Sequence, residues 1–386
     1  MTEKLYDKDA YCRGFSAKVI SCSGGDGYCE VILDKTAFFP EGGGQPADTG
    51  TLGEANVLDV QETENGIVHK TDAPLPVGAE VCGKLNWEQR FSRMQSHAGE
   101  HIVAGTVHTM FGYDNVGFHL NDNFMTVDVS GPLTKEDIEK IELAANEAIY
   151  QNNAITVTFP TAAEAAVLEY RSKLDITEGL RIVTIENVDC CACCAPHPKS
   201  TGEIGAIKIL DFYPNKGGTR MEMVAGINAY KDYARLHESN KALMRLLSAA
   251  REEVAEAVEK LNEQLQQLRS ENARLAKELA LSSIAPVTVG NSAYVISDGL
   301  SYDELRHCSN SLAEQGFVNC VLLSRSEETN YIYVVSSSEN EAKGMVAALN
   351  EAFSGKGGGK PNYAQGKITV EDEDAVKTFL SNLLTK

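Results

Sequence analysis

Hydrophobic and polar residues alternate in short runs along residues 1–85, and turn residues separate the runs. The alternation is clearest in the segments Ala17–Cys22, Cys29–Asp34, Val57–Glu62 and Gly66–Lys70. A Ser-Gly-Gly-Asp-Gly turn divides the first two segments, and an Asn-Gly turn divides the last two. Alternation of period two between such turns is typical of β-hairpins. We therefore predict that residues 1–85 form a small β-barrel-like domain.

Residues 86–230 mix helical and strand spacing of their apolar positions, which predicts an α/β core. The clearest helix start is Thr134, an N-cap residue with Asp137 three positions later and Leu133 able to pack on Ile138. Gly99 and Gly105 weaken the first helix unless a neighbour approaches closely. We expect helices at Trp87–Met110, Thr134–Gln151 and Thr161–Tyr170. We expect strands at Phe118–Val129 (as a pair), Ile155–Phe159, Ile204–Phe212 and Arg220–Gly226.

A heptad-like repeat marks residues 231–283. Residues 232–281 contain no Gly or Pro, and apolar residues recur in steps of three and four, with one irregular step between Leu261 and Leu265. The repeat predicts one long helix or coiled coil, ended by Pro286, that pairs with a second copy or folds back as a hairpin. Asn272 occupies a seam position, where it either fixes the register or lies in a solvated stretch of helix.

Residues 284–386 return to alternating strands and helices, so we predict a separate C-terminal α/β domain. A glycine-rich loop is expected over residues 355–359. The expected strands are Ser292–Ile296, Val318–Ser324 and Tyr331–Ser336. The expected helices are Tyr302–Gly316, Ala342–Phe353 and Asp372–Leu384.

At 386 residues the chain is too long for one ordinary hydrophobic core, so we predict a multidomain α+β protein. The beginning of the chain lacks an apolar signal region, and no run of roughly eighteen apolar residues occurs. We therefore expect a cytoplasmic protein without a membrane partner. Four of the ten cysteines lie in Cys190-Cys191-Ala192-Cys193-Cys194. In the cytosol these should be reduced thiols that bind metal or react, rather than a disulfide framework.

The net charge of -20 argues against indiscriminate binding of nucleic acid. A local basic surface can still hold a polyanion. Residues 355–367 carry three lysines and no acidic residue. Each single basic residue is more often a solvated surface charge. Further candidates near the metal-ligand pairs described next are Arg90, Arg93, Lys208, Lys216 and Arg220.

Two pairs of candidate metal ligands stand far apart in the sequence. His97 and His101 are separated by about one helical turn, so their imidazoles point to the same side of a helix. Cys193 and His197 repeat this spacing. One thiolate and three imidazoles suit a tetrahedral Zn²⁺ site. Either pair alone matches by chance on many helices, but the two gain weight together and beside the unusual run Thr36–Gly50.

Other groups near these pairs compete for a role. Cys190, Cys191 and Cys194 are rival ligands, and Cys190 with Cys193 would make half of a zinc knuckle that lacks a second cysteine pair. Glu100 does not complete the HExxH motif of metalloproteases, because it points about 100° away from His101 on a helix. We interpret Glu100 as a surface carboxylate or as one that supports a metal ligand.

Together these motifs resemble a known family. The run Thr36–Gly50, the two ligand pairs, Glu203-Ile-Gly205 and Arg220–Gly226 are similar to the editing domain of alanyl-tRNA synthetase. They resemble even more its free-standing relatives, the AlaX proteins, in their large form. Gly357–Gln365 resembles the glycine-rich signature of the synthetase's C-terminal domain, which is shared with DHH phosphoesterases. The resemblance spans nearly the whole chain and leaves no room for the aminoacylation domain.

This resemblance divides the chain into four parts: residues 1–85 as a β-rich domain with the glycine-rich motif, 86–230 as the editing core, 231–283 as the long helix, and 284–386 as a DHH-associated-like domain. It implies a metal-dependent hydrolase that removes the amino acid from mischarged tRNA(Ala), chiefly seryl-tRNA(Ala), with glycyl-tRNA(Ala) left open. The implied partners are the acceptor end of tRNA(Ala) and a second copy, bound through the long helix or the C-terminal domain.

The resemblance also assigns residues. The Zn²⁺ ligands are His97, His101, Cys193 and His197. Thr36 and Gln45 are the candidates for recognising serine or positioning water. The other candidates for contact with the substrate follow from the residues themselves: a glycine run lets the backbone approach a ligand closely, and basic residues can hold a polyanion. These candidates are Gly42, Gly43, Gly44, Arg93, Lys356 and Lys360. A site that hydrogen-bonds the serine hydroxyl can favour serine, because alanine would leave polar groups unpaired.

The sequence departs from the family at two places. The C-terminal glycine run is short and contains lysine. The family usually carries Cys-Gly-Gly-Thr-His, whereas Cys194, Ala195 and Pro196 fill the middle positions here. Two other functions stay open. A tRNA-binding module with a structural zinc fits a closed shell of four protein ligands. A metal-dependent phosphoesterase or peptidase would need an Asp/His-rich or HExxH site that we do not find.

Overall fold

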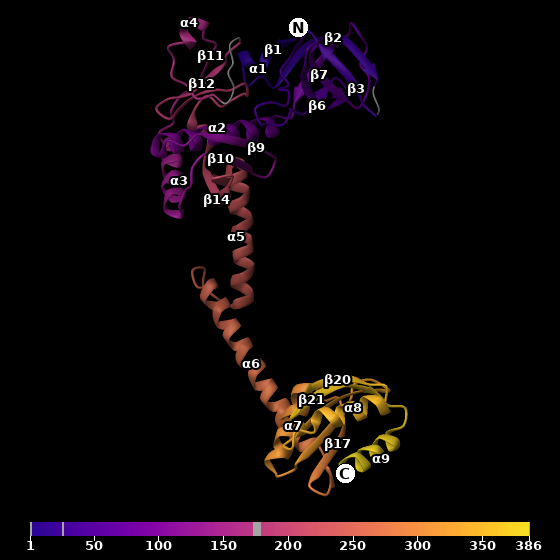
Figure 1. Cartoon of the computed structure of the whole chain (residues 1–386). Coiled ribbons are helices and arrows are strands. Elements are labelled where there is room, and N and C mark those ends of the chain that lie inside the picture. The colour runs from indigo at the N-terminus through magenta and orange to yellow at the C-terminus, as the bar shows by residue number, and fades with distance from the viewer. Residues whose placement is uncertain (1, 25–26, 173–178, 386) are drawn as a thin grey trace. The chain divides into compact units, whose positions relative to one another are not determined.

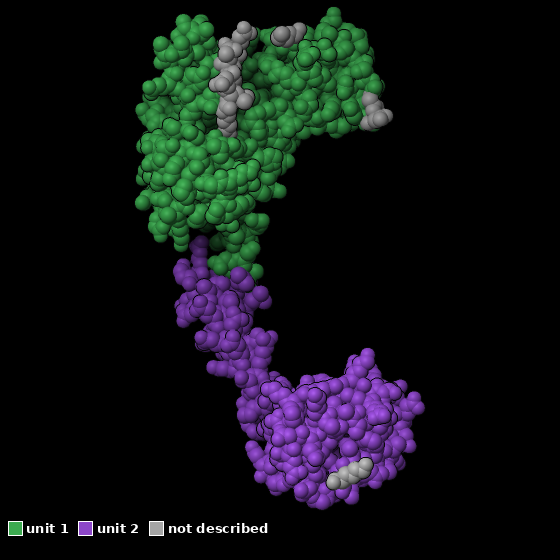
Figure 2. Space-filling view, in the orientation of Figure 1, with its two compact units in different colours: residues 1–242 green, residues 243–386 purple. Residues whose placement is uncertain are grey.

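A computed structural model describes residues 2–24, 27–172 and 179–385 of the chain (Figure 1). The predicted turn at Gly25 and Asp26 lies outside the described residues. The chain divides into two compact units, residues 1–242 and 243–386 (Figure 2). All ten cysteines are free thiols. Among the described helices, none combines the length and the apolar character that crossing a membrane requires.

The first unit begins with a closed barrel of six strands in the order β2-β3-β7-β6-β5-β8. Alternate residues point inward, as Val31 and Leu33 do in β3, and they form an apolar core with Phe38 and Phe39. A short β1 and β4 pair in parallel beside the barrel. These elements are β1 (Glu3–Lys4), α1 (Leu5–Lys8), β2 (Gly14–Gly24), β3 (Cys29–Leu33), β4 (Lys35–Thr36), β5 (Gly50–Leu52), β6 (Ala55–Thr63), β7 (Gly66–Thr71) and β8 (Glu80–Leu85).

The mixed core of the first unit contains a four-stranded antiparallel sheet, β14-β15-β10-β9, against which α2 and α3 pack (Figure 1). A second sheet, β11-β12-β13, packs on α2 through β13, which contains the first two cysteines of the cysteine cluster. The elements are α2 (Trp87–Phe111), β9 (Asn115–Leu120), β10 (Met125–Val129), α3 (Lys135–Tyr150), β11 (Ile155–Thr158), α4 (Ala162–Ala165), β12 (Ile182–Ile185), β13 (Asp189–Ala192), η1 (Thr201–Ile204), β14 (Ile207–Asn215) and β15 (Gly218–Ala225).

Helix α2 is the central element, and the predicted helix at this place is confirmed. The side chain of Asn86 accepts a hydrogen bond from the Gln89 amide at its start, and Gly112 ends it in the left-handed conformation. A Cβ atom on Gly99 would lie 2.9 Å from the Cβ of Ala225, and one on Gly105 would lie 2.6 Å from the Val188 carbonyl oxygen. The two glycines therefore let both sheets approach the helix backbone.

Two other predicted helices of the core had different outcomes. The predicted start at Thr134 is confirmed, because Thr134 and Asp137 form a reciprocal capping box. The helix predicted at Thr161–Tyr170 is wrong in length, since α4 ends at Ala165. Its capping box at Thr161 is present, but none of its residues is buried. A helix without a packed face has little to extend it beyond one turn.

The long helix predicted over 232–281 is also wrong as one continuous element. The structure has α5 (Ile227–Leu247) and α6 (Val254–Ser283), with Ser248 between them at a φ of 51°. A left-handed residue interrupts the helical hydrogen bonds, and none of residues 248–253 is buried to hold the chain straight. Neither Gly nor Pro marks this break, so the sequence pattern does not reveal it.

The second unit contains a six-stranded sheet in the order β16-β17-β18-β19-β21-β20, against which α7, α8 and α9 pack. The predicted glycine-rich loop at 355–359 is wrong, because Lys356–Lys360 forms the edge strand β20. The space above Gly357 is filled by the Tyr333 hydroxyl, so only a residue without a Cβ fits there. The elements are β16 (Val287–Val289), β17 (Ser292–Asp298), α7 (Tyr302–Glu314), β18 (Asn319–Arg325), β19 (Asn330–Ser337), α8 (Ala342–Ala352), β20, β21 (Tyr363–Thr369) and α9 (Glu373–Leu384).

One buried ion pair fixes the barrel on α2. The Arg90 side chain, in the first turn of α2, is fully buried and donates from Nε and Nη2 to Oδ2 of Asp48. It also donates to the backbone carbonyls of Ala10 and Ala37. Asp48 in turn accepts a hydrogen bond of 2.7 Å from the Phe39 amide. The pair therefore holds both ends of the glycine-rich run against the helix.

We expect Arg90→Leu to lower the free energy of unfolding of the first unit by about 3–5 kcal/mol, because it leaves the buried Asp48 carboxylate unpaired. The measurement is urea unfolding followed by the fluorescence of Trp87, the single tryptophan of the chain. Lys4→Met is the matched control, since it breaks an exposed ion pair with Glu62 in the same unit. A loss below about 1 kcal/mol for Arg90→Leu, the size expected for the control, would contradict this assignment.

Candidate metal centre

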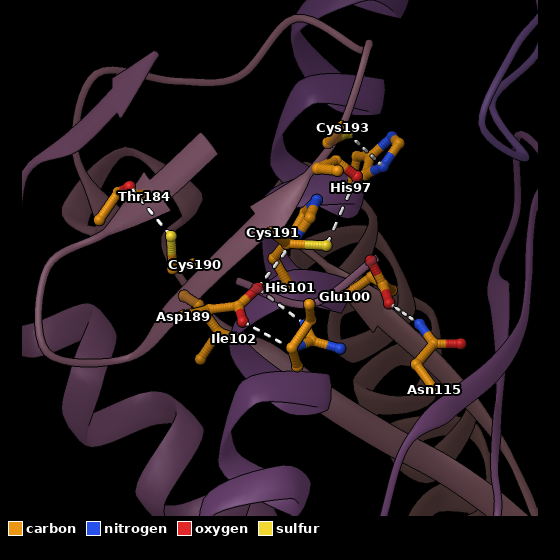
Figure 3. Close-up of polar contacts among 12 residues, drawn as sticks. His97, Glu100, His101, Ile102, Asn115, Thr184, Asp189, Cys190, Cys191 and Cys193 are labelled. Carbon is orange, nitrogen blue, oxygen red and sulfur yellow. Dashed lines mark hydrogen bonds and ion pairs between the residues drawn. The ribbon is translucent and has the colours of Figure 1, made fainter. Parts of the chain in front are cut away.

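The structure brings the four predicted metal ligands together, and Figure 3 labels three of them, His97, His101 and Cys193. His97 and His101 come from successive turns of α2, and Cys193 and His197 come from the segment after β13. Their ligand atoms all lie within 4.8 Å of one another. The Cys193 Sγ lies 3.5 Å from Nε2 of His97 and 3.9 Å from Nε2 of His197. Residues far apart in the sequence thus form one compact cluster.

Each of the three imidazoles places its Nδ1 next to an oxygen atom. His97 Nδ1 lies 3.0 Å from Oε1 of Gln45, and His101 Nδ1 lies 2.9 Å from Oδ2 of Asp189. His197 Nδ1 lies 2.8 Å from the Ala195 carbonyl oxygen. Nδ1 therefore carries the proton in each ring, and the lone pair of Nε2 is available to the cluster.

An orphaned nitrogen shows that this cluster fits a metal ion. His101 Nε2 is buried and has no hydrogen-bond partner among the described residues. A buried polar atom without a partner is costly unless a ligand satisfies it. Three imidazole nitrogens and one sulfur match the donors that Zn²⁺ prefers at a tetrahedral site. The residues present therefore fit a soft divalent ion such as zinc.

The charges at the cluster also favour a metal. Burial by itself raises the pKa of the Cys193 thiol, but His97 and His197 outweigh it and hold that pKa well below its usual range. Burial lowers the pKa of His197 to about 4, so this ring is neutral near pH 7. A thiolate and a neutral imidazole are the forms that bind metals.

Asp189 orients the His101 ring, and Arg171 in turn holds the Asp189 carboxylate. The Arg171 guanidinium donates from Nε to Oδ1 of Asp189 at 2.7 Å and from Nη2 to Oδ2 at 2.8 Å. Burial lowers the pKa of His101, but its hydrogen bond to Asp189 and the nearby thiols of Cys191 and Cys193 outweigh this and raise that pKa well above its ordinary value. A metal that binds at His101 Nε2 would therefore displace a proton from it. The sequence motifs gave no sign of either partner, although Asp189 directly precedes the cysteine cluster.

A cavity of about 970 Å³ opens beside the cluster. Gly43 and Gly44 line it together with His97, His101 and Cys193. Gly44 has a φ of 81°, and a Cβ there would lie 2.7 Å from the Phe118 carbonyl oxygen. A Cβ on Gly43 would lie 3.4 Å from the Cys194 sulfur. The positive φ of both residues and the close approach of Phe118 to Gly44 favour glycine at these positions.

Glu100 and Asn115 also line this cavity. Glu100 is 4% exposed, and Oε1 of its carboxylate accepts a hydrogen bond from the Asn115 amide (Figure 3). The interpretation of Glu100 as a surface carboxylate is therefore wrong. Helix periodicity alone could not show that β9 would cover this face of α2 and bring Asn115 to it.

Thr36 and Gln45, the candidates for serine recognition, are both fully buried. The Thr36 hydroxyl lies 2.8 Å from Nε2 of His69 and accepts a hydrogen bond from the Phe38 amide. His69 Nδ1 donates to the Val31 carbonyl, so the Thr36 hydroxyl donates to His69 Nε2. Gln45 uses Oε1 for His97, and its Nε2 donor has no partner among the described residues.

The remaining substrate candidates lie elsewhere. Arg93 is buried, donates to the Ala47 carbonyl and to Asp122, and lines a second cavity of about 720 Å³ beside Trp87. Lys356 and Lys360 lie on the exposed face of β20 in the second unit. The structure thus brings Gly43 and Gly44 to the metal cluster, but not Arg93.

The three other cysteines of the cluster, which the sequence offers as alternative metal ligands, each have different neighbours. Cys190 lies 3.6 Å from the Thr184 hydroxyl. Cys191 forms a second group with His101 and Asp189, whose possible ligand atoms also lie within 4.8 Å of one another. Cys194 lies over Gly43. A zinc knuckle built from Cys190 and Cys193 does not occur in the described part of the chain, because Cys190 takes no part in either group of metal-ligand atoms.

Three family models match successive parts of the chain. The model described as "tRNA synthetases class II (A)" matches residues 15–89. The "Threonyl and Alanyl tRNA synthetase second additional domain" matches residues 180–245. The "DHHA1 domain" matches residues 289–386. The barrel, the core with the His/Cys cluster and the C-terminal unit each therefore have a counterpart in synthetase-related proteins.

Full-length relatives join these parts in one chain. The alanyl-tRNA editing protein Aarsd1 of Rattus norvegicus is 29% identical over 95% of this chain and 94% of its own length. The alanyl-tRNA editing protein AlaX-L of Pyrococcus horikoshii is 29% identical over 99% of this chain and 98% of its own length. An alanine–tRNA ligase of Ignicoccus hospitalis is 31% identical over the whole chain, which spans 43% of that enzyme. With these domains in this order, the chain belongs to the family of alanyl-tRNA editing proteins.

Proposed function

We propose that this chain is a trans-editing deacylase that hydrolyses the ester bond of seryl-tRNA(Ala). The observation that carries the proposal is the shared cavity: the glycine-rich run of the barrel and the His/Cys cluster of the core line one space. Such a space can hold an aminoacyl group next to a metal. The names of the full-length relatives support the reaction class.

The bound ion is proposed to be Zn²⁺, held by His97, His101, Cys193 and His197. When bound, it would polarise the ester carbonyl or hold the terminal ribose. The protein's own contribution is orientation. Gln45, Asp189 and the Ala195 carbonyl fix the three rings, and Gly43 and Gly44 leave room for the aminoacyl end. The labile ester then needs little beyond positioning.

Serine selection is proposed to depend on Gln45. Its Oε1 is committed to His97, which turns the unpartnered Nε2 donor to the other side of the amide. Gln45 is fully buried and follows the two glycines that line the cavity. A serine hydroxyl that reached its Nε2 would accept a hydrogen bond, whereas alanine would leave this donor unpaired. Thr36 is proposed to position the glycine-rich run and not to contact the substrate, because its hydroxyl already donates to His69.

The acceptor end of tRNA(Ala) is the proposed ligand of the cavity, and the cytoplasm is the proposed compartment. Lys356 and Lys360, exposed on β20, are proposed to contact the RNA phosphates. Glycyl-tRNA(Ala) stays a second candidate substrate, since glycine is smaller than serine. The competing function is a tRNA-binding module in which the same cluster is structural and no ester is cleaved.

A second copy of the chain is proposed to bind along α6. Five leucines of the heptad-like repeat are exposed on this helix. A stripe with this spacing is self-complementary and would be shielded in a coiled coil. The leucines are Leu261, Leu265, Leu268, Leu275 and Leu279.

The direct test of the reaction is the release of serine and alanine from charged tRNA(Ala). We expect serine to be released at least about tenfold faster than alanine, because only serine pairs the buried donor. We expect His97→Ala or a chelator to slow serine release by at least about 100-fold, because the cluster loses its metal.

His237→Ala, which removes a histidine of α5 remote from the cluster, is the control and should keep the wild-type rate. Binding of charged tRNA without release of either amino acid, in folded zinc-loaded protein, would contradict the deacylase and favour the binding module.

We expect Asp189→Asn to weaken zinc binding by about 10- to 100-fold, because the neutral amide no longer supports the His101 ring. Competition with a chromophoric chelator measures the affinity. Asp114→Asn is the control, since this carboxylate lies on the same cavity but is mostly exposed and touches no ligand. Equal zinc affinity of Asp189→Asn and wild type would exclude a role of Asp189 in orienting His101.

For self-association, we expect the wild-type chain to sediment as a dimer at micromolar concentration and Leu268→Glu to sediment as a monomer, because the charge enters an apolar seam. Gln267→Glu adds the same charge beside the seam and should stay dimeric. A monomeric wild type would show that α6 does not bind a second copy.

A further inference from the structure

We propose that Glu100 binds the protonated α-amino group of the aminoacyl ester, so that the cavity accepts amino acids with a free amine and rejects N-acylated ones. This inference rests on the proposed deacylase function and adds a rule of specificity. It concerns the part of the substrate that serine, glycine and alanine share. The rule therefore separates aminoacyl-tRNA from tRNA that carries a blocked amino acid.

The position of Glu100 on α2 supports this role. It follows His97 by three residues, so both side chains leave the helix on nearly the same side. Both line the cavity that holds the metal ligands and the glycine-rich run. Figure 3 shows the Glu100 carboxylate beside the cluster and directed toward Asn115. A group bound next to His97 would thus meet a buried carboxylate.

The hydrogen bonds of Glu100 leave one oxygen available. Oε1 accepts from Nδ2 of Asn115, and Oδ1 of Asn115 in turn accepts from the Gly117 amide at 3.0 Å. Asn115 is thereby fixed as a donor to Glu100. The described residues offer no hydrogen-bond partner to Oε2 of Glu100, although the Arg171 guanidinium, which lines the same cavity, lies within electrostatic range of this carboxylate. Glu100 as a whole is 4% exposed and lines the cavity, so its carboxylate is suited to a cationic or donor ligand that enters there.

The other carboxylates that line the cavity are less suited than Glu100 to bind the α-amino group. Asp189 already accepts from His101 and twice from Arg171. The Asp114 side chain is mostly exposed and pairs with His108. Glu169 is exposed. Among the described carboxylates that line the cavity, Glu100 thus combines burial with a free oxygen.

The substrate supplies the matching charge. An α-amino group has an ordinary pKa of about 7.7–8.0, which the ester lowers and a neighbouring carboxylate raises, so an amine beside Glu100 is held as a cation near pH 7. Bringing this cation into a cavity is costly unless an anion pairs with it, and charge-assisted hydrogen bonds are the strong ones. Acylation of the amine removes the charge and adds bulk. An N-acyl substrate would leave Glu100 unpaired.

The test compares Glu100→Gln with the wild type on free and N-acetylated ligands. Gln keeps the shape and can still accept from Asn115 through its amide oxygen, but it has no charge. We expect zinc-loaded wild type to bind 3′-deoxy-3′-(L-serylamino)adenosine about 10- to 100-fold more tightly than its N-acetyl derivative in calorimetry. Glu100→Gln should weaken binding of the free amine by a similar factor and leave the N-acetyl ligand nearly unchanged.

The same pattern should hold for hydrolysis of seryl-tRNA(Ala) and N-acetylseryl-tRNA(Ala). Glu169→Gln, which removes an equal charge from the exposed part of the cavity, should keep the wild-type preference. Asn115→Ser, which removes the donor to Oε1, should weaken binding of the free amine by about two- to tenfold. This variant keeps the test informative if Glu100→Gln fails to fold or to bind zinc.

An equal loss for both ligands in Glu100→Gln would overturn the proposal, because it would mean that Glu100 acts on the reaction or the fold and not on the amine. An unchanged preference for the free amine would overturn it as well. Failure of the underlying function is distinguishable: the wild type would then hydrolyse neither tRNA, whereas failure of this inference leaves serine release intact.

Discussion

The buried Arg90–Asp48 pair is the contact on which the site depends. The glycine-rich run belongs to the barrel, and the metal ligands belong to the core, so the cavity exists only while the two parts stay in register. Arg90 lies two turns before His97 on α2 and binds the run at Ala37 and Asp48. A buried pair of this kind contributes little net stability but is costly to break. Its main effect is therefore to fix geometry.

The cavity follows from that register. With the run held on α2, Gly43 and Gly44 reach the cluster, and Gln45 reaches the Nδ1 of His97. Asp189, at the start of β13, orients the His101 ring in the same way. One imidazole is thus oriented by the barrel and the next by the core. A change that loosens the barrel or the core would let the imidazole that it orients rotate. We therefore expect such a change to disturb the metal cluster and the cavity together.

Much of this could be predicted from the sequence, because local signals were strong. Ligand spacing predicted a His/Cys cluster, and the capping residues at Thr134 predicted the start of α3 correctly. The failures arose where tertiary contacts decide. The break at Ser248 has no local signal, and the edge strand at Lys356–Lys360 depends on the space beside Tyr333. Glu100, Asn115 and Asp189 gained their surroundings only when β9 and β13 folded onto α2, which periodicity cannot show.

The central claim is that one cavity, formed jointly by barrel and core, holds the aminoacyl end of the substrate beside a metal. The most direct measurement is a crystal structure of zinc-loaded protein with 3′-deoxy-3′-(L-serylamino)adenosine. The account predicts the seryl group between Gly43 and the His97–Cys193 cluster, with its amine at Glu100. Binding of the analogue in the second cavity beside Trp87 and Arg93, with the metal cavity empty, would contradict it.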